Sequence, residues 1–183
     1  ILPGKAQIGL SLLEETNYVL LACSAPSGFP FLFKVDTQLM LIDRNVSLGS
    51  RGKFITGTND VLEQYSIWGL GNNELVRVKN DDMTVTDSAA LDSGFCTEIV
   101  SFILAGPYIY VGCSNGAVVR VRAVDLRRPT ESSNYDAWRL STPVLPALFP
   151  ATTDGTFAYF GTVGHRTVHT VDLLSNKTYL DRK

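Results

Sequence analysis

The stretch that decides the fold is Tyr108-Ile-Tyr-Val-Gly-Cys-Ser-Asn-Gly-Ala-Val-Val-Arg-Val, residues 108–121. Two runs of aromatic and β-branched residues, which favour strands, flank Asn115-Gly116. That dipeptide favours a tight hairpin turn because both of its residues tolerate positive φ. The stretch therefore predicts two antiparallel strands, with the small residue Gly112 near the end of the first.

The same pattern occurs four times along the chain. Each copy has a strand with a small residue near its end, a turn, and a second strand that closes on Val. The other three copies are Tyr18-Val-Leu-Leu-Ala-Cys with Phe31-Leu-Phe-Lys-Val-Asp, Tyr65-Ser-Ile-Trp-Gly-Leu with Leu75-Val-Arg-Val, and Phe157-Ala-Tyr-Phe-Gly-Thr with Thr167-Val-His-Thr-Val-Asp. The small residues, which we call anchors, are Ala22, Gly69, Gly112 and Gly161, spaced by 47, 43 and 49 residues. We expect them to occupy equivalent backbone positions.

Two further strands are expected in each repeat. An apolar run precedes the anchor strand, and a shorter run follows the second one. The preceding runs are 7–13, 53–58, 98–104 and 147–152, and the following runs are 39–42, 83–86, 137–140 and 178–180. In Met83-Thr-Val-Thr, alternation predicts Met83 and Val85 on one face of an outer strand. Each repeat thus reads as four antiparallel strands, without helical periodicity.

Four short strands repeated every ~45 residues resemble the blades of a β-propeller. The anchor motif resembles the YVTN or WD40-like β-propeller repeat superfamily, although the chain lacks a Trp-Asp dipeptide. The resemblance implies an all-β, β-propeller-like fold with four blades of four antiparallel strands. The blades fall approximately at 1–48, 49–94, 95–142 and 143–183 of a single domain, 1–183. They form a closed four-bladed ring or part of a larger one. A solenoid or an internally duplicated sandwich is the alternative architecture.

Composition excludes several classes of protein. The formal net charge of −2 argues against a nucleic-acid partner, and 183 residues suffice for one domain with a real core. The 21 uncharged residues between Glu98 and Arg120 are interrupted by Gly106-Pro107 and Asn115-Gly116, so we expect strands there and no membrane insertion. Because the chain starts with Ile1, we expect a processed product or an excerpt of a longer chain.

No catalytic or metal-binding signature is present in the sequence. The two histidines, His165 and His169, are separated by a spacing that on a strand places them about 13 Å apart, too far for a shared metal. There is no nucleophile elbow and no phosphate loop. Arg120 and Arg122 share a strand face, which could bind phosphate or sulfated glycans, or could be solvated or paired. We predict a protein that is not an enzyme and has no cofactor.

Cys96 and Cys113 flank one predicted hairpin, whose turn is Ala105-Gly106-Pro107. Neighbouring strands run about 5 Å apart, within the Cα separation that a disulfide needs. The sequence therefore predicts a Cys96–Cys113 bond, with a pair of buried free thiols as the alternative. Cys23 occupies the position equivalent to Cys113 two blades away, so we expect these two not to meet.

Two sequons, Asn45-Val-Ser and Asn176-Lys-Thr, fall in predicted inter-strand loops, where N-glycans could be attached. Together with low charge and the predicted disulfide they indicate a secreted or cell-surface protein.

The longest predicted loop contains Arg127, Arg128, Tyr135 and Trp138, residue types that are frequent at binding hot spots. We expect an interaction loop there. The alternative is a solvated loop whose Trp138 packs onto its own blade.

The resemblance also implies a function. Similar repeats occur in large secreted proteins and surface layers, including fibrous appendages of single-celled eukaryotes. We therefore expect a non-catalytic extracellular β-propeller module that acts in structural assembly or adhesion, as a subunit of a surface fibre or appendage, with protein partners and self-assembly. The alternative is a ligand-binding or enzymatic propeller whose site lies in the central channel.

Overall fold

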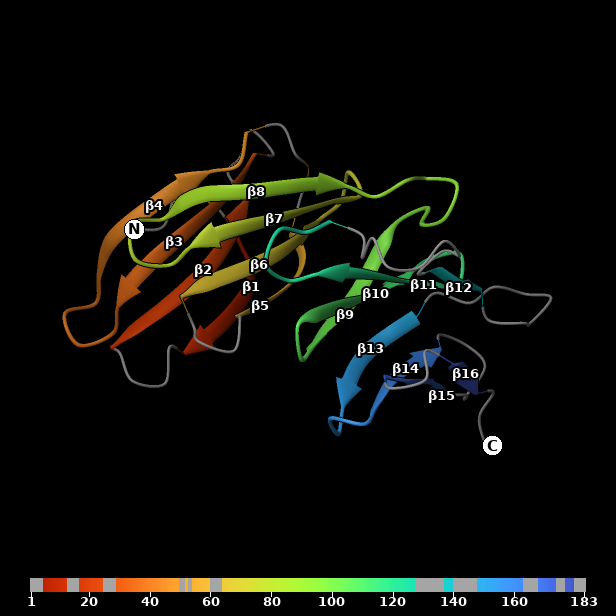
Figure 1. Cartoon of the computed structure of the whole chain (residues 1–183). Coiled ribbons are helices and arrows are strands. Elements are labelled where there is room, and N and C mark those ends of the chain that lie inside the picture. Colours follow the sequence, from red (N-terminus) through yellow and green to blue (C-terminus); the bar gives the residue numbers. More distant parts are fainter. Residues whose placement is uncertain are drawn as a thin grey trace. The chain divides into compact units, whose positions relative to one another are not determined.

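The computed structural model describes residues 5–12, 17–24, 29–49, 52, 54–59, 64–127, 137–139, 148–162, 168–173 and 177–179. All the regular structure in these ranges is β, arranged as four antiparallel sheets of four consecutive strands each (Figure 1). We call these sheets blades 1 to 4. They consist of β1 (Lys5–Leu12), β2 (Tyr18–Ser24), β3 (Pro30–Asp36) and β4 (Leu41–Ser47); β5 (Phe54–Asn59), β6 (Tyr65–Leu70), β7 (Glu74–Lys79) and β8 (Thr84–Ala90); β9 (Ile99–Ala105), β10 (Tyr108–Cys113), β11 (Ala117–Arg122) and β12 (Ala137–Arg139); and β13 (Leu148–Thr153), β14 (Phe157–Thr162), β15 (Val168–Asp172) and β16 (Lys177–Tyr179).

The four anchors occupy one structural position, as the repeat register predicts. Each is the fifth residue of the second strand of its blade, and each pairs with an apolar residue of the third strand. The pairs are Ala22↔Leu32, Gly69↔Leu75, Gly112↔Val118 and Gly161↔Val168. The repeat register is therefore confirmed, and residues can be compared between blades by counting from the anchor.

The turn between the third and fourth strands differs from the prediction. Met40, Met83 and Leu126 occupy equivalent positions in this turn and have φ of 54°, 58° and 57°. The Met83 amide donates to the Lys79 carbonyl at 2.9 Å, which places Met83 in the turn, one residue before β8. Met83 is 2% exposed and Val85 is 36% exposed. The predicted shared face of Met83 and Val85 is therefore wrong, because hydropathy alternation does not reveal a left-handed turn residue.

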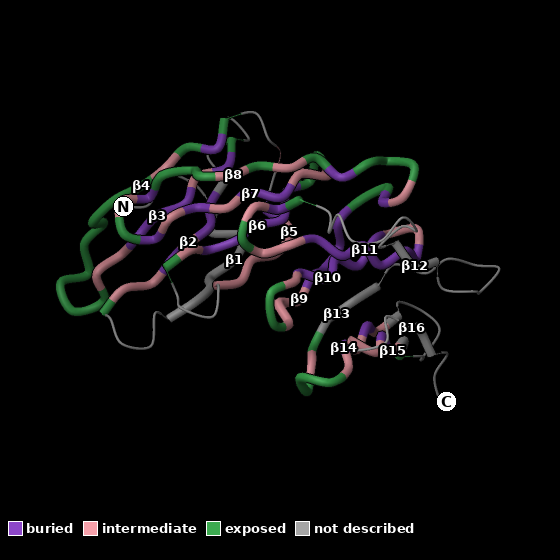
Figure 2. Tube along the Cα trace, viewed as in Figure 1, coloured by how far each residue is buried: buried purple, intermediate pink, exposed green. Residues whose placement is uncertain are grey.

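The chain divides into two compact units, Ile1–Ala89 with blades 1 and 2 and Ala90–Lys183 with blades 3 and 4. Within each unit the facing sheets share an apolar core, and the buried segments follow the middle strands (Figure 2). The core of the first unit contains Leu20, Ala22, Leu32, Leu48, Phe54, Trp68, Leu70, Val76, Val78 and Met83. The core of the second contains Val100, Tyr110, Val118, Ala158, Phe160 and Val171. The single domain 1–183 remains a prediction.

Trp68 is the largest fully buried side chain of the first unit. Its ring meets Phe54 edge-on, with centroids 5.3 Å apart, and its indole N–H donates to Ser66 Oγ at 2.9 Å. The neighbouring strand passes over the ring at Gly57, where a Cβ would lie 2.4 Å from Trp68 Cε3. Gly57 is therefore required by the close approach of the β5 backbone to this ring.

Candidate functional site

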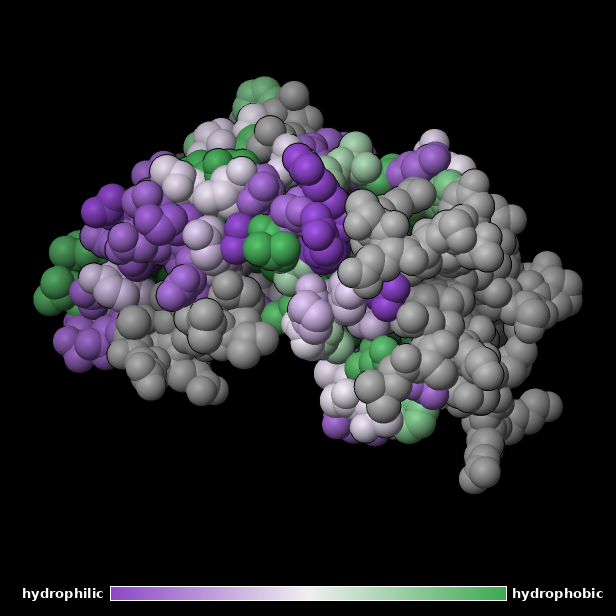
Figure 3. Space-filling view, viewed as in Figure 1, coloured by the Kyte–Doolittle hydropathy of each residue, from purple (hydrophilic) through white to green (hydrophobic). Residues whose placement is uncertain are grey.

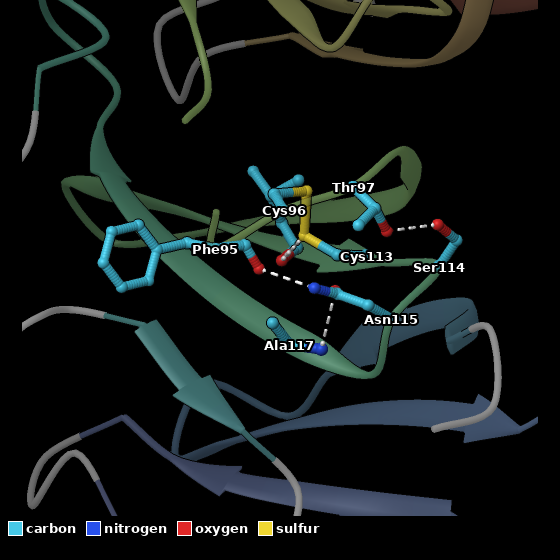
Figure 4. The surroundings of a disulfide bond; sticks show 8 residues. Phe95, Cys96, Thr97, Cys113, Ser114, Asn115 and Ala117 are labelled. Atoms are coloured by element: carbon cyan, nitrogen blue, oxygen red, sulfur yellow. Dashed lines mark hydrogen bonds between the residues drawn. A yellow bond between two sulfur atoms is a disulfide. The ribbon is translucent and has the colours of Figure 1, made fainter. Parts of the chain in front are cut away.

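Cys96 and Cys113 form a disulfide, with their Cα atoms 5.3 Å apart (Figure 4). The bond connects the segment before β9 to the end of β10. Two hydrogen bonds surround it: Asn115 Nδ2 donates to the Phe95 carbonyl at 2.9 Å, and the hydroxyls of Thr97 and Ser114 lie 2.8 Å apart. The described thiol outside this bond, Cys23, is buried, and burial raises its pKa.

Three blades carry a basic side chain over a tyrosine ring at the same position. The charged groups of Lys34, Arg77 and Arg120 lie 4.4, 3.5 and 4.5 Å from the ring centroids of Tyr18, Tyr65 and Tyr108. In each case the base lies two residues after the partner of the anchor, and the tyrosine begins the anchor strand. Such contacts stabilise a cation that has lost part of its hydration.

One of these cations, Lys34, connects two blades, and Arg77 pairs with Asp87 of its own blade, with Nη1 and Oδ2 3.2 Å apart. Lys34 is 8% exposed, and its Nζ donates to the Asp81 carbonyl in the β7–β8 turn of the next blade at 3.4 Å. Arg120 is also 8% exposed, and Arg122 pairs with Asp125 in its own turn. The structure therefore pairs Arg122, whereas Arg120 is buried over the Tyr108 ring. Sequence reasoning did not find the ring contacts, although Tyr and a base recur at fixed distances from the anchor.

An apolar turn lies on the surface of blade 1. Leu39, Met40, Leu41 and Ile42, at the β3–β4 turn, are 67%, 78%, 61% and 40% exposed. Apolar atoms gather at this end of the hairpin, at the left edge of Figure 3. The repeat equivalents of Met40, which are Met83 and Leu126, are each only 2% exposed. Blade 1 therefore presents to solvent a position that the next two blades bury.

Each blade has two faces, which we define by their residues. The trailing face carries the anchor, and the leading face carries the residues that alternate with it. Between blades 1 and 2, Leu20, Ala22 and Leu32 of the blade 1 trailing face share a core with Trp68, Val76 and Val78 of the blade 2 leading face. The joint between blades 3 and 4 repeats this arrangement, with Tyr110 and Val118 of the blade 3 trailing face in one core with Ala158, Phe160 and Val171 of the blade 4 leading face.

Two faces are less buried than their equivalents. On the leading face of blade 1, Val19, Leu21 and Val35 are half-buried, whereas the equivalent Ser66, Trp68 and Val78 of blade 2 are at most 1% exposed. On the trailing face of blade 4, Tyr159 is half-buried and Val168 is 43% exposed. The equivalent residues in blade 3, Tyr110 and Val118, are 1% and 0% exposed. Part of each of these faces is thus less buried than its equivalent, although Cys23 and Phe33 on the leading face of blade 1 are only 0% and 3% exposed.

Of the sequence-predicted site residues, Asn45 pairs with Phe33 on the leading face of blade 1, and the others lie elsewhere or outside the described residues. Asn45 is exposed, and it lies within β4, so its predicted place in a loop is wrong. Arg127 is exposed, and its amide donates to Asp125 Oδ1. Trp138 lies on β12, where its backbone pairs with Val118. Outside the described residues lie Asn176, Arg128, Tyr135, His165 and the side chains of Trp138 and His169.

Among the residues that the structure describes, no group of three His, Cys, Asp or Glu side chains could hold a metal ion. Within the same part of the chain, no helix has the length and hydropathy needed to cross a membrane.

No protein-family model matches the chain, and no curated protein matches it. Solved structures do. The chain is similar to the crystal structure of the β-propeller domain of Cps50 (Swd1) from Myceliophteria thermophila, with a TM-score of 0.73 and 10% sequence identity. The similarity covers 100% of this chain, which spans 57% of that chain. The chain therefore has a WD40-like β-propeller fold rather than that of a solenoid or a sandwich.

Proposed function

We propose that this chain is a non-catalytic extracellular β-propeller module that acts in structural assembly or adhesion through protein partners, as a subunit of a surface fibre or appendage. The observation that carries the proposal is the apolar turn of blade 1, where four consecutive apolar side chains are exposed. Clustered apolar surface of this kind is typical of protein-binding sites. The equivalents of Met40 in blades 2 and 3, Met83 and Leu126, are each 2% exposed, so an apolar side chain at this position suits a packed environment.

Two observations support the extracellular part of the proposal. The Cys96–Cys113 disulfide is of the kind that persists in oxidising compartments. The sequon at Asn45 lies on an exposed outer strand, where a glycan would meet solvent. We expect N-glycosidase treatment of native material to lower its mass, and N45Q to remove one glycan. Native material of unchanged mass and with free Cys96 and Cys113 thiols would refute secretion.

Chemical cross-linking of native material, followed by mass spectrometry, tests the assembly role. We expect cross-links from blade 1 to another polypeptide and a native mass well above the 20.0 kDa of one chain. Aspartate at Leu41, which is 61% exposed, should abolish these cross-links without unfolding the chain. The matched control is aspartate at Val124, an apolar turn residue of blade 3 that is 62% exposed. A 20.0 kDa monomer without partners would refute the proposal.

A further inference from the structure

The outer strand of blade 2, β8, presents an unpaired backbone edge. It comes last in the strand order β5-β6-β7-β8, and within the described ranges no strand pairs with the edge that faces away from β7, which we call the outer edge (Figure 1). Five of the seven residues of β8 are exposed, among them Thr84, Thr86 and Ser88. The amide and carbonyl groups along such an edge can pair with a further strand.

β8 lacks the features that protect the other outer strands from pairing. β4 carries the exposed charges Asp43 and Arg44, and its register with β3 shifts at this point. β12 and β16 are only three residues long. By contrast, β8 has seven residues without Lys or Pro, and its one charge, Asp87, is compensated by Arg77 of its own blade at 3.2 Å. Because length, charge, proline and irregular register are the usual protections, β8 is the outer strand best suited to accept another strand.

A second copy of β8 complements this edge when Thr86 lies at the centre of the pair. Two identical antiparallel strands are related by a two-fold axis perpendicular to the sheet, so one residue lies opposite its own copy. An axis at Asp87 would place two carboxylates opposite each other, which is unfavourable. An axis at Thr86 places Thr86 opposite itself and Thr84 opposite Ser88, and such hydroxyl pairs across two strands are favourable. The two Asp87 carboxylates then lie on the diagonal, about 7–8 Å apart at the backbone.

We infer that two copies of this chain pair through the outer edges of β8, antiparallel and with Thr86 on the two-fold axis. The inference rests on the proposed assembly role, and it names the chain itself as a partner at a contact separate from the apolar turn of blade 1. Two sheets of four strands each then form one continuous sheet of eight strands. The contact uses residues 84–88, which all belong to the unit Ile1–Ala89. It is isologous, so it closes at two copies.

Cysteine substitutions along β8 test both the contact and its register. Directly opposite residues of antiparallel strands have Cα atoms about 4.5–5.5 Å apart, within the range of roughly 4.4–6.8 Å that a disulfide needs. T86C should therefore form a covalent dimer of twice the 20.0 kDa chain mass under mild oxidation, seen on non-reducing gels and by intact mass. The native cysteines do not compete, because Cys23 is buried and the other two are bonded to each other.

Two further cysteine variants fix the register. T84C alone should not cross-link, because its own copy lies four positions away along the strand, about 13 Å. S88C alone should not cross-link for the same reason. A mixture of T84C and S88C should give a heterodimer, since these residues lie opposite each other. T156C, at an exposed threonine in the β13–β14 turn, is the matched control and should remain a monomer.

Sedimentation velocity of the 183-residue chain measures the contact without a cross-link. One strand pair buries less surface than a standard interface, so we expect a dissociation constant on the order of 10–100 µM. T86K should weaken the dimer at least about fivefold, because it places two like charges opposite each other and removes the hydroxyl pair. T156K adds the same charge outside β8 and should leave the dimer unchanged. Thermal melting of each variant tests whether it is folded.

Three results would overturn the inference: a wild-type chain that is monomeric up to millimolar concentration, a dimer that T86K does not weaken, or cross-linking of T84C or S88C that is as efficient as that of T86C. A dimer abolished by L41D but not by T86K would also overturn it, and would leave the assembly role of the apolar turn in place. Conversely, an intact T86C dimer together with native material that shows no cross-links from the apolar turn would overturn the proposed function of that turn and leave the β8 contact standing.

Discussion

The contact between Gly57 and Trp68 makes a sharp prediction for the Gly57→Ala variant. The added Cβ would lie 2.4 Å from Cε3 and 2.5 Å from Cζ3 of the Trp68 ring, whereas carbon atoms normally approach to about 3.5–4.0 Å. The ring has little room to move, because it is 1% exposed, packs edge-on against Phe54 and donates to Ser66. The strand or the ring must therefore shift by about 1 Å.

The change in the free energy of unfolding for Gly57→Ala is the difference between two opposing effects. Overpacking a core costs about 1–3 kcal/mol, and a displaced ring that loses its hydrogen bond to Ser66 costs about 1 kcal/mol more. Replacing glycine by alanine returns about 0.4–1 kcal/mol by restricting the unfolded chain, because Gly57 does not have a positive φ. We expect a net destabilisation of about 2 kcal/mol, or a Tm lower by roughly 4–8 °C for a chain of this size.

A double-mutant cycle with Trp68→Phe, followed by urea unfolding, tests this reasoning. The smaller ring removes the atoms that clash, so G57A in the W68F background should cost less than about 0.5 kcal/mol. Gly49→Ala is the control: Gly49 has open space around its Cβ position and a φ of 66°, so its cost is conformational and should be equal in both backgrounds. Equal costs of G57A with and without Trp68 would refute the steric explanation.

Three further predictions concern ionisable and redox-active groups. Replacing Cys96 and Cys113 by serine should lower the free energy of unfolding by about 3 kcal/mol, because the bond closes a loop with a sequence separation of 17; a loss below ~0.5 kcal/mol in urea unfolding would contradict this. Burial raises the pKa of Cys23, so its thiol should resist alkylation in the native protein at pH 8 and react once urea is added, and equal rates in both conditions would count against the buried thiol. The Tyr159 hydroxyl and the amides of Phe157 and Thr156 donate hydrogen bonds to the Asp154 carboxylate and lower its pKa. The ionised Asp154 therefore stabilises the fold at pH values above its unfolded-state pKa of about 3.9, and this stabilisation is lost as the pH falls through the lower folded-state pKa. Tyr159→Phe should raise the Asp154 pKa in an NMR titration and flatten that acid dependence, and an unchanged titration curve would exclude the hydrogen bond as its cause.

Repetition is what made the fold predictable. Gly69, Gly112 and Gly161 can be aligned because each lies near the end of a strand of similar composition, and strand pairing within each blade follows from that alignment. The sequence of a single blade would fit several all-β architectures. Four copies at similar spacings leave few architectures in which every copy is buried on both faces.

The turns and the buried charges were less accessible to sequence reasoning. Met83 looks like a strand residue because its hydropathy fits the alternation, and nothing in its chemistry predicts a φ of 58°. Lys34 looks solvated because charged residues are mostly exposed, and its Tyr18 partner lies 16 positions away on another strand. Both features depend on contacts made only in the folded sheet. The lower burial of parts of blades 1 and 4 is visible only when equivalent residues are compared between blades, and that comparison needs coordinates.

The disulfide of blade 3 also determines how the chain responds to tension. A fully stretched polypeptide extends by at most about 3.5 Å per residue. Because the disulfide joins residues with a sequence separation of 17, roughly 55 Å of contour length cannot extend when the chain is pulled from its ends. Blade 3 would then unfold in two stages, because the disulfide keeps β9 and β10 covalently linked after their backbone hydrogen bonds break. Only reduction of the disulfide would then release the remaining contour length of this loop.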